Sequence, residues 1–401
     1  MKNILFLVHR IPYPPNKGDK IRSYNFLKGL KSNYNIHLAS FIDDPVDWQY
    51  VAKVEGMTAS SLFVNLNSSF AKIKSLSGFL TNKPLSLPYY QSKQVQKWID
   101  STIVENNIEK VFIYSSAMAQ YVEKYTNLDV IVDFVDVDSD KWLQYSQKAS
   151  WPMNWVYRRE AKLLLEYDTQ IARYAQQSIF VSEQESALFE RLADMSSDRV
   201  TYVNNGVDII FFDPYGLFDT PYGNEKSIIV FTGAMDYWAN IDAVMWFVDK
   251  VFPQIRRNCK EAKFYIVGSN PSKEVMRLSA IEGVLVTGRV DDIRPYLLFS
   301  NVVVTPLLIA RGIQNKILEA MAMGKRIVAT PQAIEGITLD DQDVYVTGET
   351  TDFARQVMTN LNNTEATYCS DVNRDFVAKN YSWSASLKRL TQIIENDTVK
   401  D

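Results

Sequence analysis

The chain of 401 residues is 46% hydrophobic and 22% charged, and its formal net charge is −4. This length favours two domains with separate hydrophobic cores, and the composition excludes a largely disordered chain. The near-balanced charge does not indicate nucleic-acid binding, and no apolar run is long enough to span a membrane.

The chain opens with a short apolar run that we interpret as a buried strand. Residues 4–8 are Ile-Leu-Phe-Leu-Val, and His9, Arg10 and several prolines follow, so the run is too short for a secretion signal. The two cysteines, Cys259 and Cys369, have neither metal-ligand spacing nor a secreted context. We therefore predict a cytoplasmic protein with reduced thiols.

The loop after this strand is a candidate binding segment. Prolines at positions 12, 14 and 15 favour an extended path, and Lys17-Gly18-Asp19-Lys20 then leads into an amphipathic helix. Gly18 permits a close approach of the backbone to a ligand. A charged, solvated turn is the alternative interpretation.

Four aspartates crowd the end of a strand predicted at residues 130–135: Asp133, Asp136, Asp138 and Asp140. Asp136-Val137-Asp138 matches a short Asp-X-Asp metal pattern. Three interpretations stay open for these residues: a solvated loop, hydrogen bonds to a bound ligand, and metal binding.

Apolar strands alternate with helical segments twice along the chain. The pattern predicts an α/β protein with two Rossmann-like, doubly wound parallel sheets. Strands are expected at residues 4–8, 36–41, 61–66, 111–114, 130–135 and 178–181, and again at 227–231, 263–267, 283–286, 301–304 and 325–329. The break is expected near residues 203–212, which gives domains 1–205 and 206–380. Ligands of such sheets bind at the carboxyl ends of the strands, so we expect the site in a cleft between the domains.

Two turns of the second domain also follow predicted strands. The first runs from Phe231 to Asn240 and contains Gly233, and the second is Gly288-Arg289-Val290. An ordinary strand-ending turn explains the second equally well.

The most informative segment covers residues 310–324, between two predicted strands. Its helix begins near Asn315, which can cap it, and ends at Gly324. Gly312 allows a tight backbone approach, and the helix start attracts anions through its free N–H groups and its dipole. Arg311 and Lys316 add two cations. We therefore predict a diphosphate site formed by Arg311, Gly312, Ile313, Gln314, Asn315 and Lys316.

A carboxylate follows this site on the same helix face. Glu319 lies three residues after Lys316, about 4.5 Å further along the helix axis. That separation suits a carboxylate that holds a ribose diol beside a diphosphate. A phosphate site followed by a sugar site indicates a nucleotide-sugar ligand.

These residues resemble the donor-binding segment of glycosyltransferase family 4, retaining sugar transferases with the GT-B fold. Other segments extend the resemblance over nearly the whole chain: Lys17-Gly18-Asp19-Lys20, Asn205-Gly206-Val207-Asp208, Phe231-Thr232-Gly233, Val286-Thr287-Gly288-Arg289 and Tyr381-Ser382-Trp383-Ser384. The chain is most similar to the bacterial exopolysaccharide branch. It departs from the family at Arg311, where an acidic residue is usual.

The resemblance implies a role for each candidate residue. Glu319 would bind the donor ribose, Gly18 would approach the phosphates, and Arg289 and Val290 would frame the base. Relatives carry basic residues in the turn that here holds Gly233 and Asn240, so the phosphate charge would fall on Arg311 and Lys316. Asp138 or Asp136 would contact a sugar hydroxyl without a metal. Residues 381–401 would form a helix that returns to the first domain.

The sequence thus predicts a retaining glycosyltransferase that uses a nucleotide-diphosphate sugar, needs no cofactor or obligatory metal, and extends a saccharide or lipid-linked saccharide. We do not expect a nucleic-acid partner. A nucleotide-sugar epimerase of the same fold and a non-catalytic GT-B binding subunit are the alternatives. Aromatic residues of the first domain, including Trp151 and Trp155, belong either to the core or to a surface for peripheral association with the inner face of the cell membrane.

Overall fold

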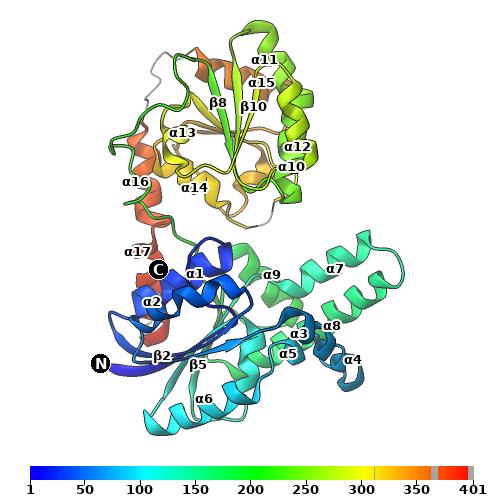
Figure 1. Ribbon diagram of the computed structural model, residues 1–401, viewed down its shortest axis with the longest axis vertical. Coiled ribbons are helices and arrows are strands. Elements are labelled where there is room, and N and C mark those ends of the chain that lie inside the picture. Colours follow the sequence, from blue (N-terminus) through cyan, green and yellow to red (C-terminus); the bar gives the residue numbers. More distant parts are fainter. Residues whose placement is uncertain (311, 363–368, 396–401) are drawn as a thin grey trace. The chain divides into compact units, whose positions relative to one another are not determined.

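The computed structural model describes residues 1–310, 312–362 and 369–395, and the chain divides into two compact units. Unit 1 comprises Met1–Asn204 and the C-terminal residues from Leu387, and unit 2 comprises Asn205–Ser386. Each unit is a parallel β-sheet with helices packed around it (Figure 1), which confirms the predicted α/β class.

The sheet of unit 1 has the strand order β3-β2-β1-β4-β5-β6-β7, with neighbouring strands parallel. The order reverses between β1 and β4, as in doubly wound folds. The strands are β1 (Lys2–Val8), β2 (Tyr34–Ile42), β3 (Ser60–Asn65), β4 (Lys110–Tyr114), β5 (Asp129–Val135), β6 (Gln177–Phe180) and β7 (Val200–Tyr202).

Helices connect these strands and cover the sheet. They are α1 (Gly18–Leu30), α2 (Val51–Glu55), α3 (Ser68–Ser75), α4 (Ser77–Thr81), α5 (Ser86–Tyr89), α6 (Lys93–Glu105), α7 (Asp138–Lys148), α8 (Met153–Tyr174) and α9 (Glu183–Ala193), with short 3-10 helices at Pro45–Tyr50 and Ser116–Tyr121. Covering both faces of the sheet excludes water from its central strands, and residues 4–8 of β1 are fully buried.

The sheet of unit 2 has the order β10-β9-β8-β11-β12-β13, again parallel throughout. The strands are β8 (Ile228–Thr232), β9 (Lys263–Val267), β10 (Val284–Gly288), β11 (Val302–Thr305), β12 (Ile327–Ala329) and β13 (Val344–Val346). Its order reverses between β8 and β11. The carboxyl ends of these two strands are therefore the expected ligand position in this unit.

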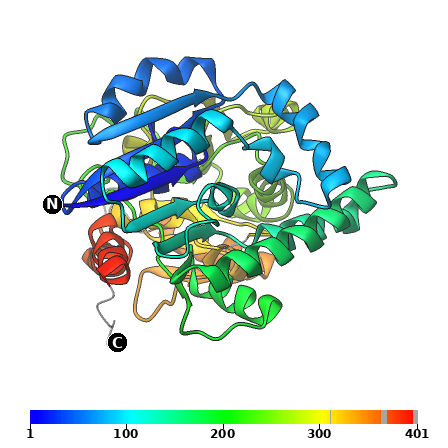
Figure 2. The ribbon, with the colours of Figure 1, turned by 90° about the horizontal axis from the view of Figure 1, so that it is seen from below.

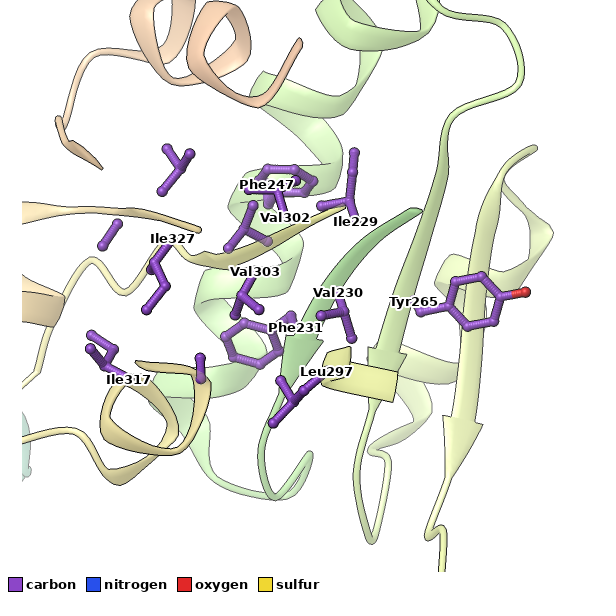
Figure 3. Packing of buried hydrophobic residues seen from close by; sticks show 14 of the residues in the cluster. Ile229, Val230, Phe231, Phe247, Tyr265, Leu297, Val302, Val303, Ile317 and Ile327 are labelled. Atoms are coloured by element: carbon purple, nitrogen blue, oxygen red, sulfur yellow. The ribbon is translucent and has the colours of Figure 1, made fainter. Parts of the chain in front are cut away.

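The helices of unit 2 are α10 (Trp238–Trp246), α11 (Phe252–Asn258), α12 (Lys273–Arg277), α13 (Arg294–Leu298), α14 (Asn315–Ala322), α15 (Thr350–Leu361) and α16 (Asp371–Asn380), with a π-helical turn at Phe247–Val251 and 3-10 turns at Leu278–Ala280 and Pro331–Ile334. The core joins strands and helices: Figure 3 shows Phe231 from β8, Phe247 from the π-helical turn and Ile317 from α14 within one cluster. Packing on Ile317 and its buried neighbours therefore fixes α14 against the sheet.

The last helix, α17 (Trp383–Glu395), packs on unit 1 from Leu387 onward. A Cβ atom on Gly29 of α1 would lie 2.3 Å from a methyl carbon of Leu387, so a larger residue there would displace the Leu387 side chain. Near its end, Glu395 accepts a hydrogen bond from Tyr34 and pairs with Lys2 at 3.4 Å. Figure 2 shows α17 in red beside the N-terminal end of β1.

Candidate functional site

The loop and helix start predicted to bind a diphosphate follow the carboxyl end of β11. Gly312 has φ +65°, a left-handed conformation that favours glycine. Gln314 occupies the N-cap position with extended backbone and no side-chain cap, and Asn315 is the first helical residue. The structure thus differs from the prediction that Asn315 caps the helix. No side-chain cap satisfies the first amides of α14, which suits them to an anion.

Lys316 lies over the end of β8, where it meets two other predicted residues. Its Nζ donates a hydrogen bond to Asn240 Oδ1 and lies 4.4 Å from the centroid of the Phe231 ring. Asn240 in turn donates from Nδ2 to the carbonyl of Ala234 at 2.8 Å. Residues 76 positions apart in the sequence are therefore joined at one end of the sheet.

Gly233 is the third member of this group. A Cβ atom at this position would lie 2.8 Å from Asn240 Nδ2 and 3.1 Å from Lys316 Nζ. Any side chain here would push the amide or the ammonium group out of place. Glycine at position 233 therefore leaves room for the contact between Asn240 and Lys316.

The charges of Lys316 and Glu319 depend on each other. Burial lowers the pKa of Lys316 to about 7, although the carboxylate of Glu319 opposes that shift. Burial also raises the pKa of Glu319 to about 7, and the charge of Lys316 opposes that shift in turn. A bound diphosphate would favour the charged lysine, because an opposite charge nearby stabilises the ammonium form.

Two threonines that sequence reasoning missed end the strands on either side of the reversal in strand order. Thr232 ends β8 and Thr305 ends β11, and both hydroxyl oxygens are buried without a hydrogen-bond partner among the described residues. Asn315 Oδ1 is likewise buried without a hydrogen-bond partner among these residues. Buried polar groups are normally paired, so these atoms mark positions for water or ligand at the same end of the sheet. A threonine as the last residue of each apolar run was the available sequence signal.

The other predicted residues of unit 2 lie at the end of β10 or just before α14. Gly288 ends β10 with φ +70°, and it is followed by an exposed Arg289 and a half-buried Val290. Ile313 is buried and Gln314 is half-buried, with Gln314 Nε2 donating to the carbonyl of Gly312 at 3.0 Å. Arg311 lies outside the described residues.

In unit 1, the structure gives no steric reason for glycine at position 18. Gly18 is exposed at the start of α1, and a Cβ atom built on it would meet nothing within 4 Å. The next residue, Asp19, accepts a hydrogen bond from Arg10 at 2.6 Å and lies 3.6 Å from His9. Burial alone would raise the pKa of Asp19, but its contacts with His9 and Arg10 hold that pKa well below its usual range.

Asp136 and Asp138 share one lysine. Lys141 Nζ lies 2.7 Å from Asp136 and 3.1 Å from Asp138. Burial would lower the pKa of Lys141, but the two carboxylates raise it above its usual value. Asp136 is half-buried and Asp138 exposed. Across the described ranges, no group of three or more His, Cys, Asp or Glu side chains is arranged to hold a metal ion.

The strand before these aspartates ends in an unusual backbone turn. Val135 has φ +71°, which is rare for a β-branched residue, and the pairing of β5 with β6 shifts register between Asp133 and Val135. Asp133 Oδ1 accepts a hydrogen bond from the Val135 amide at 3.2 Å, and its two carboxylate oxygens bind Arg22 at 2.7 and 3.1 Å. Arg22 also donates to the carbonyl of Val203 at 2.7 Å. This buried network, which sequence reasoning missed, fixes the loop that carries Asp136.

A separate cavity of about 500 Å³ lies in unit 1, and none of the predicted site residues lines it. Its wall is mainly polar and comes from α4, α5 and the loops around it, the segment at the end of the 3-10 helix Ser116–Tyr121, and α8; it includes Gln91, Gln120, Glu123, Glu166, Tyr167 and Gln170.

Comparison with known proteins identifies the fold. Residues 226–363 match the family model described as "Glycosyl transferases group 1". A search of curated protein sequences found no match. Among the described residues, no helix is both long and apolar enough to cross a membrane.

Several solved structures are similar over the whole chain. A glycosyltransferase from Rickettsia africae has a TM-score of 0.67 at 15% identity, with 100% of each chain covered. Sucrose-phosphate synthase from Thermosynechococcus elongatus gives 0.69 at 15%, with 99% of each chain covered. Anabaena HepE in complex with UDP and glucose gives 0.66 at 13%, covering 99% of this chain and 100% of HepE. The predicted GT-B fold is thereby confirmed.

Proposed function

We propose that the protein is a glycosyltransferase that transfers a sugar from a nucleotide-diphosphate sugar, with retention of configuration, to a saccharide or lipid-linked saccharide. The observation that carries the proposal is the meeting of Gly233, Asn240 and Lys316 at the uncapped start of α14, one helical turn before Glu319. The match of residues 226–363 to a glycosyltransferase family model supports it.

The donor would bind unit 2 through its nucleotide. The amides at the start of α14 and the ammonium group of Lys316 face the diphosphate in this proposal, and Glu319 receives the ribose hydroxyls. Arg311 would add a second cation, and Arg289 and Val290 would frame the base. Structures of HepE with UDP and with UDP-glucose support a nucleotide-sugar as the donor class.

Catalysis would depend on stabilising the leaving diphosphate. Positive charge from Lys316 and the helix dipole acts where negative charge develops, so no metal ion is required. With retention, a phosphate oxygen of the leaving group takes the acceptor proton on the face from which it departs. Asp136 and Asp138 would hold the transferred sugar through its hydroxyls rather than bind a metal.

The cellular role follows from the acceptor. The sequence resemblance to the exopolysaccharide branch of family 4 favours a growing bacterial polysaccharide. A lipid-linked acceptor is presented at a bilayer, and the enzyme would then work in the cytoplasm at the inner face of the cell membrane.

A panel of nucleotide-sugars tests this function. Thermal shift with the purified chain should identify a donor, and that donor should be hydrolysed slowly or transferred to an acceptor. Glu319→Ala removes charge-assisted hydrogen bonds worth roughly 1.5–3 kcal/mol each, so affinity should fall at least about tenfold. Glu261→Ala, at an exposed carboxylate of the same unit, is the control and should bind normally.

The outcomes separate the alternatives. Unchanged affinity of Glu319→Ala would remove Glu319 from the site. Tight donor binding with no turnover in the presence of acceptor would favour a non-catalytic binding subunit. Conversion of the donor to its epimer, without transfer, would favour a nucleotide-sugar epimerase.

A further inference from the structure

Two short helices of unit 1 expose their large apolar side chains. In α3, α4 and the residue between them, Phe70, Ile73, Leu76 and Leu80 are 67%, 68%, 56% and 91% exposed. The residues that α3 turns inward are small, Ala71 and Ser75. A surface helix of a soluble protein normally has the opposite arrangement, with its large apolar residues facing the core.

A second segment extends the same apolar surface. The turn before α8 and its first residues expose Trp151 by 81%, Met153 by 44% and Trp155 by 56%. The ring of Trp155 stacks on Phe79 of α4 with 6.0 Å between centroids and an angle of 11°. Figure 1 shows α4 beside α8 at the edge of unit 1. The two segments therefore form one surface, which we call the α3–α8 surface: Phe70, Ile73, Leu76, Leu80, Trp151, Met153 and Trp155.

Polar contacts hold α4 firmly against α8. Arg159 Nη2 donates to the carbonyl of Gly78 at 2.6 Å, and its guanidinium group lies 4.7 Å from the centroid of the Phe79 ring. Glu160 accepts a hydrogen bond from the Leu85 amide at 2.7 Å. These contacts fix the helices to each other, yet they leave the apolar side chains exposed. The exposed side chains are thus a built surface rather than a loose chain segment.

The chain segment that carries α3 and α4 has charge of one sign. Residues 56–99 contain Lys72, Lys74, Lys83, Lys93 and Lys97 but neither Asp nor Glu, in a chain whose net charge is −4. Lys72 and Lys83, which flank the exposed leucines, are themselves exposed. Glu160, the first acidic residue of α8, is buried and bonded to the Leu85 amide.

We propose that the α3–α8 surface docks on a bilayer that contains anionic lipids. Apolar side chains enter the boundary between headgroups and acyl chains, tryptophan favours that boundary, and lysines at the rim attract anionic headgroups. The exposed Lys72 and Lys83 beside the apolar side chains favour an anionic bilayer surface as the occupant. The inference deepens the proposed function, since a lipid-linked acceptor is presented at a bilayer, but it can be tested without donor or acceptor.

Cosedimentation of the purified full chain with vesicles tests the docking. The protein should bind phosphatidylcholine vesicles that contain one third phosphatidylglycerol, and bind vesicles of phosphatidylcholine alone at least about tenfold more weakly. The double variant Phe70→Ser with Leu80→Ser should bind the anionic vesicles at least about tenfold more weakly than the unchanged protein. Both residues are too exposed for these changes to disturb the core.

Ile210→Ser with Leu217→Ser is the matched control, because these unit 2 side chains are 86% and 103% exposed. It should bind vesicles normally. The proposal would be overturned if the unchanged protein did not bind anionic vesicles, or if both double variants bound them equally. It would also be overturned if the protein bound no vesicles but self-associated, and if Phe70→Ser with Leu80→Ser abolished that self-association. Nucleotide binding by Phe70→Ser with Leu80→Ser, measured separately, should be normal, so failure of the docking surface is distinguishable from failure of the donor site.

Discussion

Lys316 has a protonation state that depends on what it contacts. Burial lowers its pKa to about 7, and it donates to the neutral amide oxygen of Asn240. A diphosphate beside this lysine would replace a neutral acceptor with an anionic one. Because the anion prefers the ammonium form, binding must be accompanied by proton uptake whenever the free lysine is deprotonated.

This coupling predicts that nucleoside diphosphate affinity falls as the pH rises above 7. Each pH unit above the pKa of the free lysine should weaken binding by up to about tenfold, since protonating the lysine then costs about 1.4 kcal/mol per unit. Titration calorimetry from about pH 7.5 to pH 9, in two buffers of different ionisation enthalpy, measures both affinity and proton uptake. Lys316→Met should bind weakly with little pH dependence over that range. Flat affinity without proton uptake in the unchanged protein would contradict this role of Lys316.

Local sequence patterns identify site residues that are close in sequence but not contacts between distant segments. The sequence segment around Lys316 and Glu319 was informative because the site residues lie within a few positions of each other. The contact of Lys316 with Asn240 joins two distant segments, and no local pattern specifies it. The bond between Arg22 and Asp133 likewise spans 111 positions, so an arginine within an amphipathic helix resembled an ordinary surface residue.

At the scale of elements, the pair of Arg22 and Asp133 ties α1 to the end of β5. Both side chains are fully buried. Burial raises the pKa of Asp133 even though Arg22 opposes that shift. A carboxylate in this position is therefore stabilised mainly by its arginine. Removing that arginine would leave a buried charge beside the turn at Val135.

We accordingly expect Arg22→Met to destabilise unit 1 by about 3–5 kcal/mol, and the double variant with Asp133→Leu to recover part of the loss. Urea denaturation followed by circular dichroism measures both changes. Lys162→Met is the control, since it breaks the exposed pair with Glu166 in the same unit and should cost less than about 1 kcal/mol. Equal costs for Arg22→Met and Lys162→Met would show that the buried network does not support the fold.

Runs of apolar residues predicted the central strands well because these strands are buried on both faces. Two edge strands were missed, β7 at Val200–Tyr202 and β13 at Val344–Val346. Each has three residues, most of which are half-buried or exposed, so neither forms the buried apolar run that marks a central strand. Lys325, expected to begin a strand, precedes β12 instead, and its buried ammonium group donates to the carbonyl of Leu298 at 2.8 Å.

At the scale of the whole molecule, the chain leaves unit 1 after Asn204 and returns to it after Ser386. The segments at these crossings contact each other within unit 2. The Val207 amide donates to the carbonyl of Tyr381 at 2.7 Å, and a Cβ atom on Gly206 would lie 2.4 Å from the Trp383 nitrogen. The two motifs that carried the family resemblance, at residues 205–208 and 381–384, therefore contact each other, and this contact leaves no room for a side chain at position 206. The sequence alone did not reveal that they are partners.

The final prediction concerns the reaction of the whole chain: activity should be independent of metal, and the product should retain the anomeric configuration of the donor. The charge that a metal would supply is proposed to come from Lys316 and the start of α14, while Asp136 and Asp138 already share Lys141. With the donor found in the panel, proton NMR of the product formed with and without EDTA should show one retained anomer at equal rates.

Each half of this result can fail separately. An inverted product would reject a mechanism in which the leaving phosphate takes the acceptor proton, and would require a general base on the opposite face of the sugar. Activity that EDTA abolishes and Mg²⁺ or Mn²⁺ restores would instead assign a metal to Asp136 and Asp138. Lys141→Met distinguishes the cases further: it removes the cation that those carboxylates share, and should strengthen any metal dependence only if they bind the ion.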